Sequence, residues 1–417
     1  MKILEIIGNK PLSGTVRIAG AKNSAVALIP ACILTSNKVT LTNVPNISDI
    51  NDLENILTYL NVSVKRASES IVIDANDMKN VLIPNELSSK LRASYYFMAS
   101  ILARFKKVEM YFPGGCQIGS RPIDQTLKVF RALGANVTEE NCLFTIEAEE
   151  LRGAEIELDM PSVGATVNAI IVASLAKGRT VIKNAAREPE IVDLINMLNS
   201  MGAKINGAGN STIAIDGVDT LDGCFHNVIP DRIEAGTYLI LGSMLGNYLK
   251  IDNIIPEHIK SLTDKLNEMG ADIEINEDYI VINAVNNLIA TNIKTLGYPG
   301  FPTDLQQPFT TLLTQCHGES EVNETIYENR YMNVPYLNEM GANIEVSGRF
   351  AKIKGPLKLK GRNVVATDLR AGASLLLAGL KAEGKTTISN IEHILRGYEE
   401  IVEKLTNIGA KIEIKEI

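Results

Sequence analysis

A short phrase that ends in Gly-Ala recurs along the chain, and it limits the possible folds more than any other feature. It appears as Leu133-Gly134-Ala135, Met201-Gly202-Ala203, Met269-Gly270-Ala271, Met340-Gly341-Ala342 and Ile408-Gly409-Ala410, with a degenerate copy at Leu60-Asn61-Val62. The steps between positions 60, 133, 201, 269, 340 and 408 are 73, 68, 68, 71 and 68 residues. Each phrase follows an amphipathic run such as 191–200, and its glycine suits the left-handed residue that ends a helix. Repetition at a nearly fixed period predicts an array of similar structural units.

Each repeat also contains a second helical run and several β-rich runs. Helical runs at 165–176 and 370–381 precede β-rich runs at 180–182 and 386–388, and alternating residues such as 271–275 follow the Gly-Ala phrase. A unit therefore consists of strand, helix, strand, helix, strand and strand, and six such units fit the chain. This order predicts an α/β protein with mixed sheets around a helical core, with three units in each of two lobes.

The repeat boundaries place the lobes at 22–230 and at 1–21 plus 231–417. The first strand, at 15–18, precedes the first helix and is expected to complete the second lobe. The chain would then cross between the lobes near Ala21-Lys22 and again near Pro230-Asp231. We expect the active site between the lobes, because pockets favour domain interfaces.

Composition excludes several classes of protein. The net charge of −8 argues against a nucleic-acid surface, and no run approaches the roughly 18 apolar residues of a membrane span. The five cysteines are odd in number and include no Cys-x-x-Cys pair, so neither a zinc site nor a disulfide framework is indicated. We therefore expect a cytoplasmic, reduced protein without a metal. Residues 379–386 have P-loop spacing, but a helical run precedes them and a strand follows, so we interpret them as a helix cap and turn.

The segment 113–122 is the strongest candidate for chemistry. Gly114 and Gly115 allow a tight bend, and Cys116 and Arg121 follow them. An arginine binds phosphate or carboxylate through its fork, and a nearby cation lowers the pKa of a thiol and so favours the reactive thiolate. The alternative is a buried, inert thiol in a hairpin.

Charged residues also open several of the predicted helices. Lys22-Asn23, Arg92, Asp231-Arg232, Asp304, and Asp368 with Arg370 lie at such starts, while Arg396 lies in a Leu-Arg-Gly-Tyr segment. An aspartate at a helix start is explained equally well by capping or by function. A cation there opposes the helix dipole, so anion binding is the favoured explanation for the lysine and the arginines.

Together these segments resemble the enolpyruvyl transferase family over essentially the whole chain. The resemblance is carried by Lys22-Asn23, 113–122, 162–166, 186–190, 230–234, 301–304, 328–330 and 366–370. It implies a fold of two lobes, an inside-out α/β barrel with three repeated units in each lobe. It also implies transfer of the enolpyruvyl group of phosphoenolpyruvate to the 3′-hydroxyl of UDP-N-acetylglucosamine by addition and elimination, with release of phosphate and without a cofactor. The cysteine loop and the Asp304 segment are specific to the branch of the family that uses this sugar nucleotide.

The resemblance assigns roles to individual residues. Cys116 is similar to the residue that protonates the methylene carbon, forms an adduct with phosphoenolpyruvate and is alkylated by fosfomycin. Asp304 is similar to the group that accepts the proton of the sugar hydroxyl, and Asp368 and Arg370 to its neighbours at the reacting centre. Lys22, Arg121 and Arg396, with Asn23, resemble the residues that hold phosphoenolpyruvate. The contacts to the UDP-sugar are implied to be Arg92, Arg121, Pro122, Ile123, Asp124, Gln125, Ser162, Val163, Gly164 and Ile326.

Two departures and two alternatives accompany this assignment. Gln125-Thr126 stands where the family usually has Leu-His, and Met160-Pro161 precedes Ser162 where some members carry a lysine. Both lie on the nucleotide side.

One alternative is the shikimate-pathway relative, 3-phosphoshikimate 1-carboxyvinyltransferase, which lacks the cysteine loop. The other is a non-catalytic paralogue that binds the UDP-sugar and regulates a partner.

Overall fold

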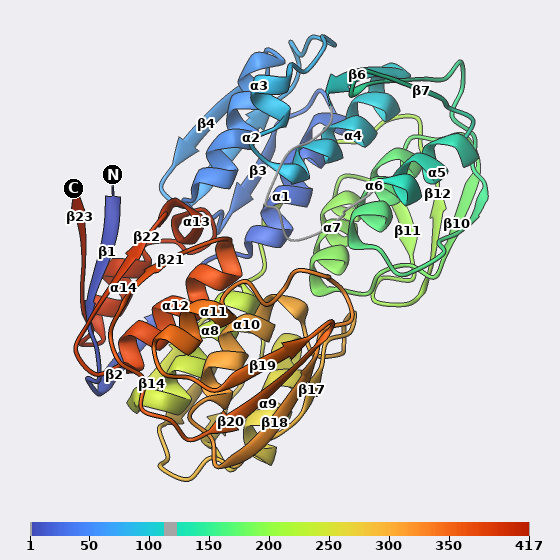
Figure 1. The fold of residues 1–417 in the computed structure, drawn as a ribbon. Coiled ribbons are helices and arrows are strands. Elements are labelled where there is room, and N and C mark those ends of the chain that lie inside the picture. Colours follow the sequence, from blue (N-terminus) through green and yellow to red (C-terminus); the bar gives the residue numbers. More distant parts are fainter. Residues whose placement is uncertain (1, 112–122, 417) are drawn as a thin grey trace. The chain divides into compact units, whose positions relative to one another are not determined.

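The computed structural model describes residues 2–111 and 123–416, so Cys116, Arg121 and Pro122 lie outside the described residues. The described chain divides into two compact units (Figure 1). The N-terminal unit comprises residues 20–111 and 123–229, and the C-terminal unit comprises residues 2–19 and 230–416. Each unit has a hydrophobic core of its own.

Three sheets make up the strands of the N-terminal unit. Their orders are β13-β3-β5-β4, β6-β8-β7 and β11-β12-β10-β9. The strands are β3 (Val39–Thr42), β4 (Ser63–Ala67), β5 (Ser70–Asp74), β6 (Lys107–Tyr111), β7 (Asn136–Glu140), β8 (Leu143–Glu147), β9 (Glu155–Glu157), β10 (Arg179–Lys183), β11 (Lys204–Asn206), β12 (Thr212–Asp216) and β13 (Phe225–Asn227). The helices are α1 (Lys22–Ala31), η1 (Cys32–Leu34), α2 (Ser48–Tyr59), α3 (Asn85–Ser88), η2 (Arg92–Tyr95), α4 (Tyr96–Phe105), α5 (Asp124–Ala132), α6 (Val163–Ala173) and α7 (Pro189–Ser200).

The C-terminal unit also has three sheets, with orders β21-β22-β1-β23, β15-β16-β14-β2 and β17-β18-β20-β19. Its strands are β1 (Lys2–Ile7), β2 (Leu12–Arg17), β14 (Gly246–Asp252), β15 (Asp272–Ile275), β16 (Tyr279–Asn283), β17 (Ile293–Lys294), β18 (Gly318–Asn323), β19 (Ile344–Ser347), β20 (Phe350–Gly355), β21 (Asn363–Val365), β22 (Lys385–Ser389) and β23 (Lys411–Glu416). Its helices are α8 (Arg232–Leu245), η3 (Pro256–Ile259), α9 (Lys260–Glu268), α10 (Thr303–Leu313), α11 (Val334–Glu339), α12 (Leu369–Lys381), α13 (Glu392–Leu395) and α14 (Ile401–Asn407).

The four-stranded sheets are mixed, as the sequence predicted, and they all have the same pattern. One outer strand pairs in parallel and the remaining pairs are antiparallel, as in β9 with β10 and β10 with β12. The expectation that the first strand completes the C-terminal half is confirmed, since β2 pairs in parallel with β14. In return, β13 pairs with β3 of the first repeat. The chain ends also meet, because β1 lies between β22 and β23 (Figure 1).

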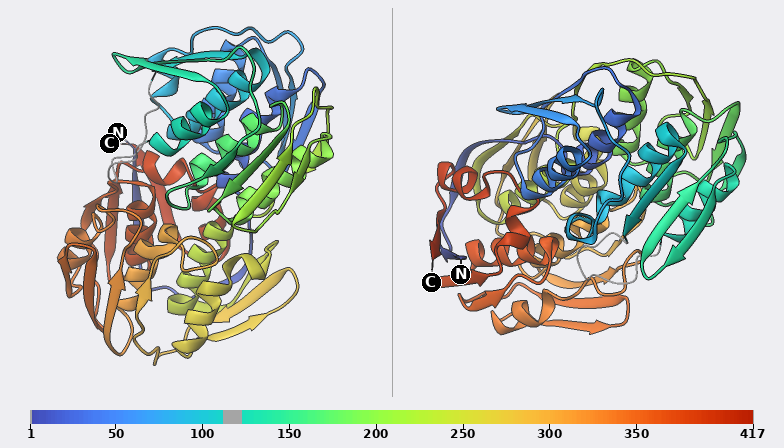
Figure 2. Two further views of the ribbon diagram at one scale, coloured as in Figure 1. Left: turned by 90° about the vertical axis from the view of Figure 1, so that its right-hand side faces the viewer. Right: turned by 90° about the horizontal axis from the view of Figure 1, so that it is seen from above.

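Within the C-terminal unit, α8, α10 and α12 pack against one another, and the strands run around them (Figure 2). Such central helices are largely buried, and they bury polar side chains such as Gln306 and Gln307 of α10 together with their apolar residues. Residues 233–245 of α8 are all buried, for example. The starts of these helices carry the charged residues that the sequence singled out.

The glycines of the repeat phrase have the conformation that the sequence predicted. Gly134, Gly202, Gly270, Gly341 and Gly409 all have φ between 82° and 106°, and Asn61 takes the same role at φ 62°. Glycine adopts this left-handed region without a steric penalty, and asparagine tolerates it better than most residues. The segment 379–386 also has the predicted order, with α12 before the turn and β22 after it.

Three expectations need correction. The second repeat lacks a full first strand, because Ile83 makes only an isolated parallel bridge to Met110 beside the three-stranded sheet. Arg92 opens the short 3-10 helix η2 instead of the α-helix, which begins at Tyr96. The helix expected at 165–176 occupies 163–173, because the predicted end is a turn leading into β10.

Candidate active site

The three central helices of the C-terminal unit begin in two different ways. Asp231 caps α8, accepting hydrogen bonds from the backbone N–H groups of Ile233 and Glu234 at 2.8 and 3.0 Å. Asp368 caps α12 in the same manner, at 2.8 and 2.9 Å. Capping is therefore confirmed for both aspartates. Asp304 lies in the first turn of α10, whose N-cap residue is Pro302, and its carboxylate contacts other elements.

Asp304 is held between two buried arginines. Its Oδ1 lies 2.5 Å from Nη2 of Arg330, and its Oδ2 lies 2.8 Å from Nη2 of Arg370. The two arginine side chains are 2% and 7% exposed, whereas that of Asp304 is 27% exposed. Burial alone would lower the pKa of Arg370, but the nearby Asp304 carboxylate raises it overall. The Asp304 carboxylate is thus partly exposed to solvent while two buried guanidinium groups hold it in place.

A buried glutamate fixes the loop that carries Ile326 to the start of α10. Glu324 accepts hydrogen bonds from the backbone N–H groups of Ile326 and Tyr327 at 2.8 and 3.1 Å. Its other oxygen accepts the Thr303 hydroxyl at 2.9 Å. Ile326, 40% exposed, is thereby placed beside the helix start that bears Asp304.

Arg396 directly follows α13 and belongs to a segment that joins the same cluster. Two residues farther on, the Tyr398 hydroxyl lies 3.3 Å from Nη1 of Arg370 and 3.0 Å from the Thr237 hydroxyl on α8. The C-terminal unit thus brings together three of the expected residues, Asp304, Ile326 and Arg370, around the start of α10. Arg396 lies two residues before Tyr398, which contacts Arg370.

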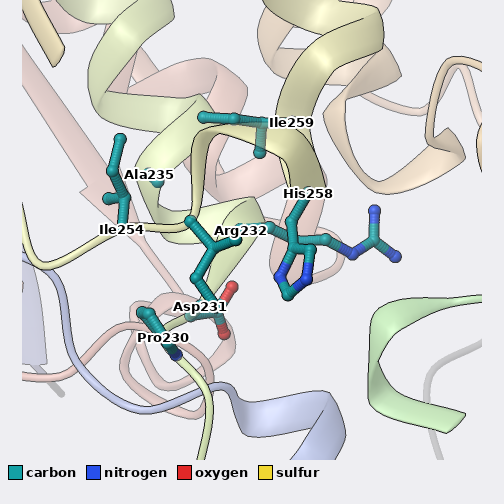
Figure 3. A pocket seen from close by; sticks show the side chains of 8 residues that line it. Pro230, Asp231, Arg232, Ala235, Ile254, His258 and Ile259 are labelled. Atoms are coloured by element: carbon teal, nitrogen blue, oxygen red, sulfur yellow. The ribbon is translucent and has the colours of Figure 1, made fainter. Parts of the chain in front are cut away.

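A small pocket lies at the start of α8 against η3. Pro230, Asp231, Ala235, Ile254 and Ile259 are among its lining residues, and its volume of about 170 Å³ includes space open to solvent. Figure 3 shows the Arg232 side chain extending away from the apolar lining. Its guanidinium lies 5.8 Å from the ring centre of Tyr298. The pocket is too small for a sugar nucleotide.

In the N-terminal unit, Lys22 is fixed by an ion pair. It is the first residue of α1, whose N-cap residue Ala21 supplies no capping side chain. Its Nζ lies 2.6 Å from Oδ2 of Asp49 on α2, whose side chain is 2% exposed. Asn23 follows on the same helix turn. The ion pair with a buried carboxylate fixes the ammonium of Lys22 at a helix start, where backbone N–H groups favour anions.

The predicted nucleotide contacts 162–164 lie against the segment that carries Arg92. Ser162 caps α6, accepting the Ala165 N–H at 3.3 Å. A Cβ atom at Gly164 would lie 1.6 Å from the Tyr95 hydroxyl oxygen, so glycine is required for this approach. Tyr95 ends the 3-10 helix that Arg92 begins, and Val163 is 37% exposed beside it.

Ile123, Asp124 and Gln125 form the start of α5, and Gln125 is tied to the loop before Ser162. Its amide donates to Oδ2 of Asp159 at 2.6 Å and accepts the backbone N–H of Asp159 at 3.0 Å. Lys128 contacts the other oxygen at 2.6 Å. Hydrogen bonds from Lys128 and Gln125 lower the pKa of Asp159. The unusual Gln125 thus has a structural partner of its own.

Sequence reasoning missed several residues that build these clusters. Arg330 lay in a segment quoted for the resemblance without a role, and Asp49, Glu324 and Tyr398 were not singled out. In the sequence, such a residue can be noticed only as a charged side chain within an otherwise apolar repeat. That pattern does not indicate which residue it pairs with.

Thiol and metal chemistry can be assessed for the described part of the chain. Burial raises the pKa of Cys32, Cys224 and Cys316, that of Cys316 to about 12. Cys142 is exposed. Within residues 2–111 and 123–416, no group of three His, Cys, Asp or Glu side chains has an arrangement that could hold a metal ion.

Comparison with known proteins defines the class. The EPSP synthase (3-phosphoshikimate 1-carboxyvinyltransferase) family model matches residues 6–405. The enolpyruvyl transferase NikO from Streptomyces tendae superposes with a TM-score of 0.91 at 25% identity, over 99% of both chains. EPSP synthase from Acinetobacter baumannii shares the fold, with a TM-score of 0.79 at 17% identity over 100% of both chains. The chain therefore belongs to the EPSP synthase family of enolpyruvyl transferases.

Particular members of the family are much more similar in sequence. UDP-N-acetylglucosamine 1-carboxyvinyltransferase 2 of Bacillus anthracis is 54% identical over 413 residues, which cover 99% of this chain and 96% of that protein. The protein of the same name from Listeria monocytogenes is 52% identical over 98% of this chain and 97% of its own length. In the described residues, no helix combines the length and apolar character needed to span a membrane.

Proposed function

We propose that this enzyme transfers the enolpyruvyl group of phosphoenolpyruvate to the 3′-hydroxyl of UDP-N-acetylglucosamine and releases phosphate. The reaction supplies a precursor of peptidoglycan. The observation that carries the proposal is the 54% identity to UDP-N-acetylglucosamine 1-carboxyvinyltransferase 2 over 99% of the chain. The ion pairs of Asp304 support it, because they fix a carboxylate where a substrate hydroxyl can reach it.

In the proposed addition step, the sugar O3′ attacks C2 of phosphoenolpyruvate while its proton passes to Asp304. The methylene carbon, C3, takes a proton from Cys116, which gives a tetrahedral adduct. In the elimination step, the Cys116 thiolate takes a proton back from C3 as the C2–O bond to phosphate breaks and the enolpyruvyl ether forms. Inorganic phosphate leaves with the proton that Asp304 accepted, so both side chains return to their starting states. Arg330 and Arg370 offset the negative charge of Asp304 when no proton is present. A carboxylate within hydrogen-bond reach of the attacking hydroxyl can act as its general base.

The remaining assignments are part of the same proposal. Lys22, Arg121 and Arg396, with Asn23, bind phosphoenolpyruvate, and the pairing of Lys22 with Asp49 fixes the ammonium for a phosphate. Asp368 orients the start of the helix that carries Arg370. The UDP-sugar contacts are Arg92, Arg121, Pro122, Ile123, Asp124, Gln125, Ser162, Val163, Gly164 and Ile326. Fosfomycin alkylates Cys116.

We further propose that the halves 22–230 and 1–21 plus 231–417 are the lobes of an inside-out α/β barrel. The reaction takes place in the cytoplasm, without a cofactor. The repeated strand and helix order in both units supports the architecture.

Phosphate release with UDP-N-acetylglucosamine and phosphoenolpyruvate tests the function. Asp304→Asn is expected to lower kcat by about 10²–10⁴, the usual contribution of a general base. Asp264→Asn is the matched control, because Asp264 pairs with Lys260 on the exposed face of α9. Turnover of 3-phosphoshikimate instead would assign the enzyme to the other branch. Tight binding of the UDP-sugar without turnover would indicate the regulatory paralogue.

A further inference from the structure

The hydroxyl group of Tyr398 lies where two central helices of the C-terminal unit meet. Tyr398 is 2% exposed and belongs to the turn between α13 and α14. Its oxygen is 3.0 Å from the Thr237 hydroxyl on α8 and 3.3 Å from Nη1 of Arg370 on α12. Through these contacts, the segment that follows Arg396 is joined to both helices.

The groups on either side of the Tyr398 hydroxyl determine the direction of both of its hydrogen bonds. Thr237 donates its proton to the backbone carbonyl of Ile233 at 2.8 Å, so its oxygen accepts from Tyr398. Arg370 has only donors, so Tyr398 accepts from Nη1. The hydroxyl therefore donates to one partner and accepts from the other, and a group without a hydroxyl cannot replace it.

The second nitrogen of the same guanidinium contacts Asp304. Nη2 of Arg370 lies 2.8 Å from Oδ2 of Asp304, while Nη1 points to Tyr398. Because the guanidinium is planar and rigid, fixing one nitrogen sets the direction of the other. Burial raises the pKa of Tyr398, so its hydroxyl keeps the proton that it donates to Thr237.

We infer that Tyr398 is a positioning residue: its hydroxyl orients the guanidinium of Arg370 and thereby the carboxylate of Asp304. The inference rests on the proposed function, because it takes Asp304 as the group that acts on the sugar hydroxyl. Nothing in the proposed chemistry requires Tyr398 to touch a substrate.

A second buried tyrosine in the same unit provides a matched comparison. Tyr331 is 8% exposed, and its hydroxyl is 3.0 Å from the backbone oxygens of Val322 and of Arg349. Both partners are main-chain carbonyls, so the Tyr331 hydroxyl supports the fold without orienting a charged side chain. Tyr398→Phe and Tyr331→Phe thus remove the same atom from two comparable places.

Steady-state kinetics with both substrates should separate the two variants. Tyr398→Phe is expected to lower kcat by about 10- to 100-fold, because small displacements of a reacting group have effects of this size. The KM values should change less than kcat, since the variant displaces Arg370 and Asp304 at the reacting centre and leaves the residues proposed to bind phosphoenolpyruvate in place. Tyr331→Phe should keep kcat within about twofold of the wild type. Equal kcat values for the two variants would overturn the inference.

Substitutions of Thr237 test the hydrogen bonds of the Tyr398 hydroxyl without altering the tyrosine itself. Thr237→Val removes the acceptor for Tyr398 and should reduce kcat in the same direction, whereas Thr237→Ser retains the hydroxyl and should restore most of it. This pair decides the matter if Tyr398→Phe does not fold. Equal kcat for Thr237→Val and Thr237→Ser contradicts the inference.

A crystal structure of Tyr398→Phe supplies a readout that does not depend on turnover. A changed direction of the Arg370 guanidinium relative to Asp304 supports the inference, and an unchanged one overturns it. An inactive wild-type enzyme would refute the proposed function alone, because the crystallographic comparison would still decide the role of Tyr398.

Discussion

The buried carboxylate of Asp193 should be a major contributor to the stability of the N-terminal unit. It lies on α7, and its Oδ2 accepts the hydroxyl of Ser24 on α1 at 2.6 Å. Its Oδ1 is 2.8 Å from Nε2 of His226 on β13. The backbone N–H of Ile229 lies 3.5 Å from Oδ2. One carboxylate thus joins two helices and a strand that are far apart along the chain.

The size of the effect follows from the groups that Asp193→Ala would leave without an acceptor. Ser24 is fully buried and the His226 side chain is 13% exposed, so neither is readily hydrated. A buried donor that loses its partner costs about 1–3 kcal/mol, which gives a loss of about 2–6 kcal/mol for the two together. In a unit of this size, each kcal/mol shifts the melting temperature by about 2–4 °C, so the expected decrease is roughly 4–24 °C.

Calorimetry of the full-length chain is the appropriate assay, with two controls. Asp193→Asn keeps an acceptor for Ser24 and a group that can pair with neutral His226, so it should lose less than half as much. Asp216→Ala removes an exposed carboxylate that lies 3.5 Å from Arg179 and should shift the melting temperature by less than about 2 °C. Equal melting temperatures for the Asp193→Ala and Asp216→Ala proteins would refute the reasoning.

Three other perturbations have defined outcomes. Gly164→Ala should lower the melting temperature, because the new Cβ meets the Tyr95 hydroxyl, and adding Tyr95→Phe should recover part of the loss in a thermal scan. Fosfomycin should label Cys116 and none of the four other cysteines in peptide mass mapping; Cys116→Asp should resist the drug with residual activity, and Cys116→Ser should be severely impaired. Burial raises the pKa of Glu234 above its ordinary 4.5, so the native state binds this proton more tightly than the unfolded state. The resulting stabilisation is lost as pH rises through the folded-state pKa. Urea unfolding from about pH 4 to 7 should therefore show Glu234→Gln gaining stability relative to the wild type, and a constant difference would contradict this.

Much of the local architecture could be predicted because it depends on short stretches of sequence. The left-handed glycines, such as Gly202 at φ 98°, follow from the end of an amphipathic helix and the alternation after it. Counting repeats led to the expectation that the run at 15–18 completes the C-terminal half, and β2 indeed pairs with β14. The strand β1 that precedes it was not foreseen. The isolated bridge at Ile83 did not follow, because the repeat pattern alone does not determine how far two strands pair.

The partners within the site could not be predicted from the sequence. Asp304 and Arg370 are 66 residues apart, and Ser24 and Asp193 are 169 apart, so no local pattern relates them. Arg330 illustrates the difficulty, because an arginine within a polar segment is expected at the surface and is 1% exposed here. Its burial depends on the nearby Asp304 carboxylate, which compensates its charge.

The repeats themselves indicate where the C-terminal unit departs from a purely structural design. α8, α10 and α12 occupy equivalent places in three repeats, and each has an aspartate at or near its start. Asp231 and Asp368 bond to the backbone of their own helices, as a cap does. Asp304 lies within the first turn instead and bonds to Arg330 and Arg370 from two other elements. A capping aspartate is sufficient to begin such a helix, so the different placement of Asp304 requires another explanation. Sites that break a local rule within a consistent scaffold are expected to be functional. This broken equivalence favours Asp304 as the reacting centre of the C-terminal unit independently of any similarity to other proteins.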